Sequence, residues 1–590
     1  MSTPTDYLKQ PTLQQSEKLP HGTCADCKSV INIGIFFDGT DNSLTRDKPE
    51  WGHSNIARLS EAYKNDPYEG YFRHYVNGIG TRFEGISEVD PSFRGSPWGA
   101  GGAARIVYGL LQVLNSLHAF VNDTIPMFND KQVKALCGEH MVVRPNPNEW
   151  PSTETEENVI LTALEVSGGL VNDSKLRHTF LTKHAGKITM QLARAATTPN
   201  VSGVYLDVFG FSRGAAQARV FCTWLFESLL KDGKLCGVPA YVRFLGLFDT
   251  VASVGLNVTG HHAWATTKNL RIHSEVKSCV HYVALHEFRN NFPLDSLCVD
   301  GVLPPNCCEQ LAVGCHSDVG GGYEPGVQGK GITLRALDPN NPIKLTATKD
   351  GGDQNKLSQL SLNLMLAAAR KSREGHGTDG DPWLKFDSKE AIASKLDKEF
   401  ACDPGVRTSV EHYFSTCGVA PSIPLDQAFR EHATLYVAFR YTVARQENGF
   451  HQLPSYKYAQ SSDPLIKFYE QGEKIFVEQL KVIDGMMGML KNPSEEDFEE
   501  KNYHSKAGVI YKKVKGMKLP PGVGLFFDRY VHDSYAGFIG KFGLDMGFFH
   551  GLEHIIAEPR RYFCYRYMYQ GDDTRYNAML MELQQDRAMA

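Results

Sequence analysis

The motif Gly210-Phe211-Ser212-Arg213-Gly214 constrains the fold more than any other stretch of this chain. It lies between a short apolar strand candidate, Val204–Phe209, and a run of small residues compatible with a helix. A tight strand-to-helix turn displays a serine hydroxyl above a sheet, and the flanking glycines make room for its crowded backbone. This context predicts a nucleophile elbow carrying Ser212. The alternative is a glycine-rich turn that holds a solvated serine.

Length and composition set the class of protein. The chain has 590 residues, which predicts two or more folding units or one large domain with insertions. Its hydrophobic content of 42% and charged content of 22% are ordinary, and a net charge of -5 argues against a general nucleic-acid binder. Residues 1–30 lack the apolar segment of a signal peptide, and Val107–Val121 is too short and too polar to span a bilayer. We expect a soluble chain made in the cytoplasm that does not use the general secretory route.

The thirteen cysteines indicate reduced thiols rather than a disulfide framework, because several lie in apolar strand candidates of a long chain. Cys24 and Cys27 have a spacing typical of metal ligands, and Cys307 and Cys308 could complete a set of four. A structural zinc site usually shows two clear ligand pairs. The favoured interpretation is therefore a flexible arm that holds two thiols, and no metal or other cofactor is expected.

Apolar strand candidates alternate with helical patterns over the first half of the chain. The strand candidates are Val30–Phe37, Val204–Phe209, Val242–Phe248, Cys279–Leu285 and Gln310–Cys315. This alternation predicts an α/β fold with a mostly parallel sheet and helices on both faces. In such a sheet, functional side chains collect at the carboxyl ends of the strands.

Two later strand candidates end in groups that could serve a serine nucleophile. Val242–Phe248 runs directly into Asp249, and Gln310–Cys315 runs into His316, which a glycine-rich loop follows. A nucleophilic serine needs a base that takes its proton and a carboxylate that orients the base. The order Ser212, Asp249, His316 is that of α/β hydrolases. We predict that these three residues form the catalytic triad.

Other histidines compete with His316 for the role of base. His532, in an aromatic-rich segment, ranks second, since a late histidine can fold back over an active site. His281 and His286 lie on or beside one of the strand candidates. A Ser–Asp dyad that uses Asp318, with His316 as a bystander, is a further alternative.

The oxyanion of the tetrahedral intermediate needs two N–H donors. One is expected to be the backbone N–H of Arg213, directly after the nucleophile. The other is expected from the turn after the first strand, at Asp38 or Gly39. An aspartyl nucleophile at Asp38 is disfavoured, because the D-x-D-x-T pattern of phosphoryl transfer is absent.

The chain divides into three predicted regions. Residues 1–29 form a flexible arm, 30–335 an α/β-hydrolase catalytic domain, and 336–590 a mainly helical region that serves as a cap, a membrane contact or a partner-binding surface. The helix candidates of this last region are Leu357–Lys371, Lys389–Phe400, Leu425–Ala438 and Leu465–Leu490. The aromatic stretch from Leu525 to Phe549 could contact a membrane, although core packing is the favoured interpretation.

Four motifs together resemble one family. They are Phe37–Asn42, Gly210–Ala215, Phe248–Val251 and His316–Tyr323. Their combination is similar to the type VI secretion lipase effectors of the G-x-S-x-G class, first family, over about Val30 to Tyr323. The resemblance implies an antibacterial phospholipase that uses Ser212, Asp249 and His316 through an acyl-serine intermediate. It also implies loading onto a secretion spike protein, action on membrane phospholipid in the periplasm of the target cell, and a cognate immunity protein in the producer.

Two other functions remain open. The same fold could hydrolyse soluble esters or thioesters inside the producing cell, or a degenerate hydrolase fold could serve as a binding scaffold. The sequence leaves the choice between the sn-1 and sn-2 ester open, with a preference for sn-1 through the resemblance.

Overall fold

The computed structural model describes most of the chain. The described residues are 8–13, 28–86, 88, 101–138, 156–193, 200–252, 263–289, 292–331, 353–373, 381–385, 396–420, 423–489, 503–536 and 562–571. Cys24 and Cys27, whose spacing suggested metal ligands, and Phe549, at the end of the aromatic stretch, lie outside these ranges. So does the first part of the predicted helix Lys389–Phe400.

A central sheet organises the first half of the chain. Its strands are β1 (Lys28–Phe37), β2 (Tyr71–Val76), β3 (Asn200–Phe211), β4 (Leu230–Lys231), β5 (Lys234–Leu235), β6 (Val238–Phe248), β7 (Cys279–Ala284) and β9 (Cys307–Ala312). Six of them run parallel in the order β2-β1-β3-β6-β7-β9, and β4 and β5 extend the start of β6 as an antiparallel hairpin. The predicted mostly parallel α/β sheet is confirmed.

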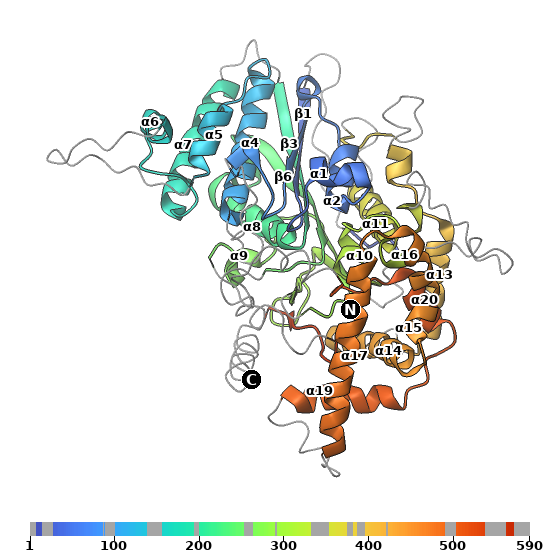
Figure 1. Cartoon of the computed structure of the whole chain (residues 1–590). Helices are drawn as coiled ribbons and strands as arrows, with labels where there is room; N and C mark the ends of the chain where they lie inside the picture. Colours follow the sequence, from blue (N-terminus) through green and yellow to red (C-terminus); the bar gives the residue numbers. More distant parts are fainter. Residues whose placement is uncertain are drawn as a thin grey trace.

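Helices cover both faces of this sheet (Figure 1). The helices of this half are α1 (Leu44–Asp47), α2 (Asn55–Ala62), α4 (Gly102–Val121), α5 (Asp130–Leu136), α6 (Glu156–Ala163), α7 (Ser174–Ala193), α8 (Arg213–Ser228), α9 (Thr267–Leu270) and α10 (His316–Gly320). Helices α4, α7 and α8 pack against one another on one face, and α2, α10 and α11 (Leu357–Lys371) contact one another on the other. Both faces of the strands are therefore apolar, as is typical of a parallel sheet.

Strand β1 contributes side chains to two hydrophobic cores, one on each face of the sheet. Ile31, Ile33 and Ile35 are fully buried in the core beneath α4 and α8. Phe36, which points to the opposite face, stacks on Phe209 of β3 in the other core. Because side chains alternate along a strand, this nearly continuous apolar run places one set on each face.

The second half of the described chain is mainly helical, which confirms the predicted character of this region. Its helices after α11 are α13 (Pro404–Thr416), α14 (Leu425–Arg445), α15 (Gly449–Gln452), α16 (Pro454–Ser462), α17 (Ile466–Met489), α19 (Tyr503–Lys515) and α20 (Val523–Tyr530). They gather at one end of the molecule, and their buried apolar side chains belong to the core that contains Phe36 and Phe209 (Figure 1). Phe526 and Phe527 of α20 are buried there, whereas Leu525 is half exposed.

A short strand links the two halves. Strand β10 (Met568–Tyr569) pairs in parallel with β8 (Leu294–Asp295), which follows β7 along the chain. The predicted boundary between a catalytic domain and a helical region at residue 335 remains a prediction. The pairing nevertheless means that a segment near residue 568 is built into the first half of the molecule.

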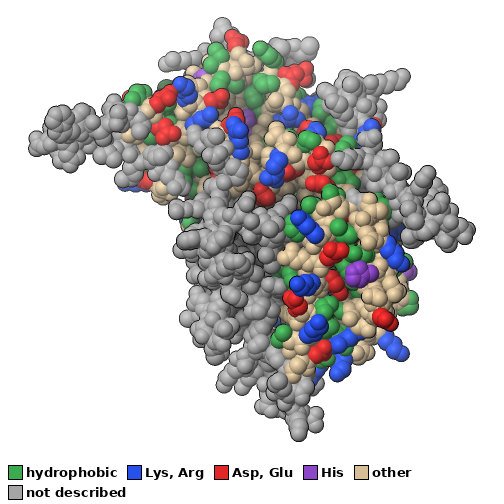
Figure 2. All heavy atoms as spheres, viewed as in Figure 1, with side chains coloured by type: hydrophobic (Ala, Val, Ile, Leu, Met, Phe, Trp, Pro, Cys, Tyr) green, Lys and Arg blue, Asp and Glu red, His purple; other side chains and the backbone are tan. Residues whose placement is uncertain are grey.

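The described surface is mixed in charge. In the view of Figure 2, basic and acidic side chains are interspersed with apolar ones over both the sheet-containing part and the helical part. None of the helices among the described residues is long and apolar enough to cross a membrane.

Gly214 allows α8 to start against the end of β1. A Cβ atom at this position would lie 2.3 Å from the carbonyl oxygens of both Phe37 and Asp38, and neither backbone can yield without moving the strand. We expect Gly214→Ala to lower the free energy of unfolding by about 1–3 kcal/mol, measured by denaturant titration.

The matched control for this substitution is Gly186 in the middle of α7, where a Cβ would meet no atom within 4 Å. Gly186→Ala is expected to be neutral or to stabilise by up to about 1 kcal/mol, because alanine favours the helix. Equal effects at the two glycines would contradict the close approach at Gly214.

Candidate active site

Ser212 occupies the tight turn between β3 and α8. Its backbone has φ 59° and ψ -126°, a conformation that non-glycine residues rarely adopt. Two hydrogen bonds hold it there: its N–H donates to the carbonyl of Phe248 (3.0 Å), and its carbonyl accepts from the N–H of Val251 (3.2 Å). Strained backbone that neighbouring strands enforce is typical of functional sites.

The position of this turn in the sheet also indicates a site. Strand β1 lies between β2 and β3, so the chain leaves β1 toward one side and later returns to its other side. Such a reversal of strand order opens a crevice at the carboxyl ends of the two strands. Ser212 follows β3 and Asp38 follows β1, so both lie at this reversal.

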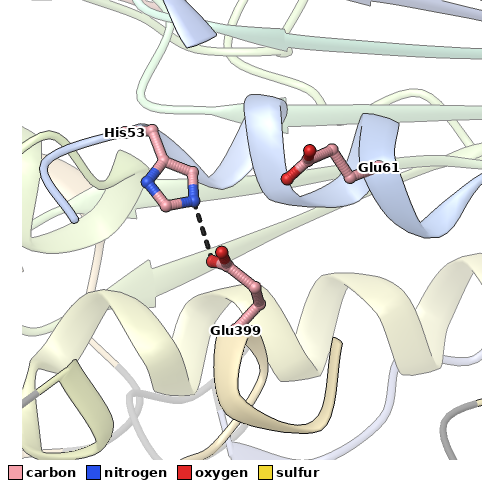
Figure 3. Close-up of side chains that lie close together, drawn as sticks. All are labelled: His53, Glu61 and Glu399. Carbon is pink, nitrogen blue, oxygen red and sulfur yellow. Dashed lines mark hydrogen bonds and ion pairs between the residues drawn. The ribbon is translucent and has the colours of Figure 1, made fainter. Parts of the chain in front are cut away.

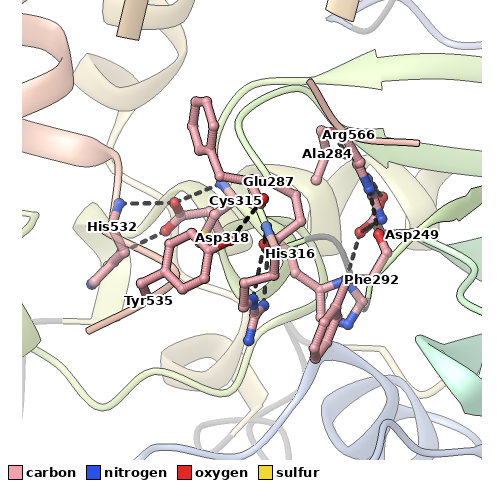
Figure 4. A network of polar contacts seen from close by, with 12 residues as sticks. Asp249, Ala284, Glu287, Phe292, Cys315, His316, Asp318, His532, Tyr535 and Arg566 are labelled. Atoms are coloured by element: carbon pink, nitrogen blue, oxygen red, sulfur yellow. Dashed lines mark hydrogen bonds and ion pairs between the residues drawn. The ribbon is translucent and has the colours of Figure 1, made fainter. Parts of the chain in front are cut away.

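Asp249 and His316 are hydrogen-bonded to each other. Asp249 follows β6 directly with φ 40°, and its Oδ2 lies 2.5 Å from Nδ1 of His316, the first residue of α10 (Figure 4). Asp249 is fully buried, and His316 and Ser212 are 4% and 3% exposed. With Nδ1 bound to a carboxylate, the second ring nitrogen of His316, Nε2, is the one left for proton transfer.

The elbow and the histidine meet through an aromatic ring. Phe211, the residue before Ser212, lies with its ring centroid 4.6 Å from that of His316. The ring of Phe292 packs edge-on against the same imidazole, with the two ring centroids 5.0 Å apart. The hydrogen bonds among the described residues do not include one between Ser212 and His316. Catalytic hydrogen bonds often shorten only when substrate is bound, so Ser212 and His316 stay the candidate nucleophile and base.

The main chain of His316 is held by a buried ion pair. Its N–H donates to Oε2 of Glu287 at 3.2 Å. Arg289 binds the same carboxylate through Nε and Nη2, each at 2.8 Å. The Arg289 guanidinium outweighs the cost of burial and lowers the pKa of Glu287 to about 2. The charged carboxylate is therefore a fixed acceptor at the start of α10.

Burial and charge act in opposite directions on the two central groups. Burial alone raises the pKa of Asp249, but the charge of Arg566 and the bond to His316 outweigh it and hold this pKa below its usual value. Burial lowers the pKa of His316, although Asp249 opposes the shift. The site therefore holds an ionised carboxylate beside a neutral imidazole near neutral pH, which is the state a general base needs.

The backbone N–H groups expected to bind the oxyanion differ in whether they already donate a hydrogen bond within the chain. The N–H of Asp38 donates to the carbonyl of Val76 (3.0 Å), and that of Gly39 donates to Oδ1 of Asp38 (2.7 Å). Both N–H groups already have acceptors within the chain. Among the hydrogen bonds of the described residues, none uses the N–H of Thr40 or Arg213, and Nε of Arg213 donates to Oγ1 of Thr40 at 2.5 Å.

The Asp38 carboxyl group organises the turn rather than facing a substrate. Its oxygens accept hydrogen bonds from Ser54 Oγ and Tyr75 Oη, both at 2.5 Å, besides the Gly39 N–H. Burial raises its pKa to about 6 against the lowering effect of these donors. With three donors occupying it, this carboxyl group has no geometry for attack on a phosphoryl group.

His532, the second candidate for the base, is engaged elsewhere. Its Nδ1 lies 2.5 Å from Oδ1 of Asp318, its backbone N–H donates to Oδ2, and its Nε2 lies 3.1 Å from the carbonyl of Val327. The ring stacks on Tyr323 with centroids 3.9 Å apart. Both ring nitrogens have partners, and Asp318 holds the imidazole of His532 in place (Figure 4).

The other two histidines are buried inside the fold. His281 accepts from the N–H of Thr250 through Nε2 (3.0 Å) and pairs with Glu309 through Nδ1 (2.9 Å). His286 accepts from the N–H of Gly314 (3.0 Å), and burial lowers its pKa. The structure therefore brings His316, and neither of these histidines, to Asp249.

One cluster has the residue types of a metal site. His53, Glu61 and Glu399 offer ligand atoms within 4.8 Å of one another, and His53 Nε2 lies 2.8 Å from Glu399 (Figure 3). The two carboxylates are already neutralised, since Lys48 pairs with Glu61 and Arg58 with Glu399. We interpret the cluster as an ion-pair network that ties α2 to the helical half of the chain.

Residues 230–368 match the model of a family described as T6SS, phospholipase effector Tle1-like, catalytic domain. The resemblance drawn from the motifs is confirmed by this match. The matched range includes Asp249 and His316, and Ser212 lies 18 residues before its start. No curated protein matches the chain at a significant level.

Solved structures give a second comparison. The chain is similar to an uncharacterized protein from Pseudomonas aeruginosa, with 24% identity, a TM-score of 0.66, and coverage of 93% of this chain and 80% of that chain. This likeness concerns the fold. A structure of the Tle1 effector bound to the VgrG spike from the type 6 secretion system also matches, with 16% identity, a TM-score of 0.31, and coverage of 71% of this chain and 88% of that one.

Sequence reasoning missed two contributors to the site. Arg566 binds Asp249 through both guanidinium Nη atoms, at 2.7 and 2.8 Å, from a segment 317 residues away in sequence. The N–H of Thr40, which donates no hydrogen bond within the described part of the chain, lies one residue beyond the expected donors. No sequence motif indicates Arg566, because it is one of many arginines and no local pattern sets it apart from the others. The aspartate at position 38 was visible in the sequence, and its carboxylate can accept a hydrogen bond from the N–H of Gly39. Considering that bond would have moved the expected oxyanion donor from Gly39 to Thr40.

Proposed function

We propose that the chain is a phospholipase effector of type VI secretion that hydrolyses acyl esters of glycerophospholipids. The observation that carries the proposal is the strained Ser212 beside the hydrogen-bonded pair of Asp249 and His316. The family match over residues 230–368 supports the substrate class and the route of delivery. The proposed partners are membrane phospholipid, a secretion spike protein and a cognate immunity protein, and the proposed place of action is the periplasmic side of the target membrane.

The proposed reaction proceeds in two halves. Ser212 Oγ attacks the ester carbonyl carbon while His316 Nε2 accepts the hydroxyl proton, and Asp249 stabilises the imidazolium through Nδ1. The tetrahedral intermediate collapses when His316 gives that proton to the leaving alcohol, which departs as a lysophospholipid. Water, activated by His316, then attacks the acyl-serine and releases the fatty acid.

The oxyanion is proposed to bind between two backbone donors. Arg213 is the first residue of α8, where N–H groups have no acceptor inside the helix. Thr40 faces it from the turn after β1, and the bond between Arg213 Nε and Thr40 Oγ1 fixes the two segments together. Two such donors are worth several kcal/mol to the transition state.

The test of this proposal is product analysis on a phospholipid with different acyl chains at sn-1 and sn-2. We expect release of fatty acid and lysophospholipid, with sn-1 preferred, and toxicity when the protein is directed to the periplasm of a susceptible bacterium. Hydrolysis of soluble esters alone, with intact vesicles and no toxicity, would instead favour the intracellular esterase. Killing that persists in Ser212→Ala would favour the binding scaffold.

A further inference from the structure

Arg566 is the most unusual feature of the candidate site. It belongs to the segment 562–571, which returns from the helical half of the chain to the sheet. The carbonyl of Tyr567 accepts from the N–H of Leu294 (2.8 Å), and that of Tyr569 accepts from Ser296 (2.9 Å). These bonds fix the backbone next to Arg566, so its side chain reaches Asp249 from a defined direction.

Nearly every donor of this guanidinium has a partner. Nη1 and Nη2 donate to the two oxygens of Asp249, Nε donates to the carbonyl of Phe292 (2.7 Å), and Nη1 also reaches that of Ala284 (3.3 Å). Arg566 is only 7% exposed. A buried two-point contact of this kind fixes the plane of a carboxylate as well as its position.

The Asp249 carboxylate also makes two further hydrogen bonds, to Ala284 and to His316. Oδ1 of Asp249 also accepts from the N–H of Ala284 (2.9 Å), and Oδ2 is the atom bound to His316 Nδ1 (Figure 4). Rotation of the carboxylate would break the contact with His316. Arg566 and Ala284 together oppose that rotation, because a rotated carboxylate would lose the hydrogen bonds that they donate to Oδ1 and Oδ2.

Arg566 also sets the charge seen by the imidazole. The charged groups that act on His316 are Asp249, directly after β6, and Glu287 and Arg289 from the segment after β7, whereas Arg566 acts through its contact with Asp249. Arg566 neutralises the charge of Asp249, the main stabiliser of a protonated His316. Without it the imidazolium would be favoured more strongly, and the base would lose its proton only at higher pH.

We propose that Arg566 is a positioning residue of the catalytic site, so that hydrolysis requires the segment 562–571 to be docked against β8. This inference rests on the proposed function. Arg566 acts by holding the Asp249 carboxylate in the plane that orients His316, and by keeping His316 neutral at working pH. The helical half of the chain thereby supplies part of the active site rather than only a cover or a docking surface.

The test compares Arg566→Gln and Arg566→Lys in the full-length chain with Arg219→Gln. Arg219 is the matched control, because it is equally buried and holds the carbonyls of Asp295 and Ser296, on the same β8 segment, without touching Asp249. All rates are divided by the fraction of folded protein, measured by circular dichroism. The substrate is a vesicle of phosphatidylethanolamine and phosphatidylglycerol.

We expect Arg566→Gln to lower kcat about ten- to a hundredfold with KM changed less than twofold, and to move the acid limb of the pH profile up by roughly one unit. Arg566→Lys keeps the charge and loses the two-point contact, so its acid limb should stay near that of the wild type while kcat recovers in part. Arg219→Gln should retain the wild-type kcat and pH profile per folded molecule.

The titration of the His316 ring is followed by NMR of protein whose histidines carry an isotope label at Cε1. The signal of His316 is identified because it is missing from the spectrum of His316→Ala. This readout does not depend on lipid hydrolysis. We expect the ring to titrate at higher pH in Arg566→Gln than in the wild type. An unchanged titration, or equal kcat loss in Arg566→Gln and Arg219→Gln, would overturn the inference. A wild type that hydrolyses no phospholipid would overturn the proposed function, while the titration would still decide the role of Arg566.

Discussion

We expect Ser212→Ala to lower phospholipid hydrolysis by at least about a thousandfold, because Ser212 is the nucleophile of the proposed acyl-enzyme. The substitution removes one buried oxygen that makes no hydrogen bond among the described residues, so the fold should survive. Alanine accepts the observed backbone conformation no less readily than serine. Thermal unfolding of the variant should therefore stay close to that of the wild type.

The measurement is fatty-acid release from vesicles, together with labelling by a fluorophosphonate probe. We expect the wild type to take up one probe per chain and Ser212→Ala to take up none. Ser174→Ala is the control, since Ser174 is an exposed serine at the start of α7. Stoichiometric labelling of Ser212→Ala would show that another residue is the nucleophile.

The second large effect is expected at the base. His316→Ala should lower turnover about a thousandfold or more, because both the proton acceptor and the function of Asp249 are lost. A Ser–Asp dyad that uses Asp318 predicts instead that His316→Ala keeps substantial turnover. The contacts of Asp318 with His532 and with the N–H of Cys315 argue for the triad.

His532→Ala separates a structural role from a catalytic one. The substitution removes the ring that contacts Oδ1 of the buried Asp318 and the carbonyl of Val327, whereas the backbone N–H of residue 532 still donates to Oδ2 of Asp318. We expect the lost ring contacts to lower the free energy of unfolding by about 1–3 kcal/mol. Turnover per folded molecule should change little. The comparison is made with chemical denaturation and with initial rates normalised to probe-labelled enzyme. A fully folded His532→Ala that has lost turnover, beside an active His316→Ala, would reverse the assignment of the base.

The strands were predictable because a parallel sheet buries both faces of each strand. The observed strands β1, β6 and β7 begin and end within four residues of the predicted ones, which were Val30–Phe37, Val242–Phe248 and Cys279–Leu285. The last strand is different, since β9 ends at Ala312 and three residues separate it from His316. Strand β2, Tyr71–Val76, was missed, because it has only six residues and the basic pair Arg73 and His74 interrupts its apolar residues.

The sequence by itself determined which residues could do the chemistry. A serine between a strand and a helix, an aspartate directly after a strand and a histidine before a glycine-rich loop are local patterns, so they can be recognised without the fold. Their order along the chain predicted an α/β hydrolase, and the parallel sheet with helices on both faces confirmed the architecture. Local patterns carry this information because turns and strand ends depend on neighbouring residues.

Only the tertiary structure decided which groups meet. It placed His316, the first-ranked candidate for the base, against Asp249, and His532, the second-ranked one, against Asp318. It also gave the Asp38 and Gly39 N–H groups acceptors within the chain and brought Arg566 to the Asp249 carboxylate. Contacts between residues hundreds of positions apart depend on how whole elements pack, and no local pattern encodes that packing.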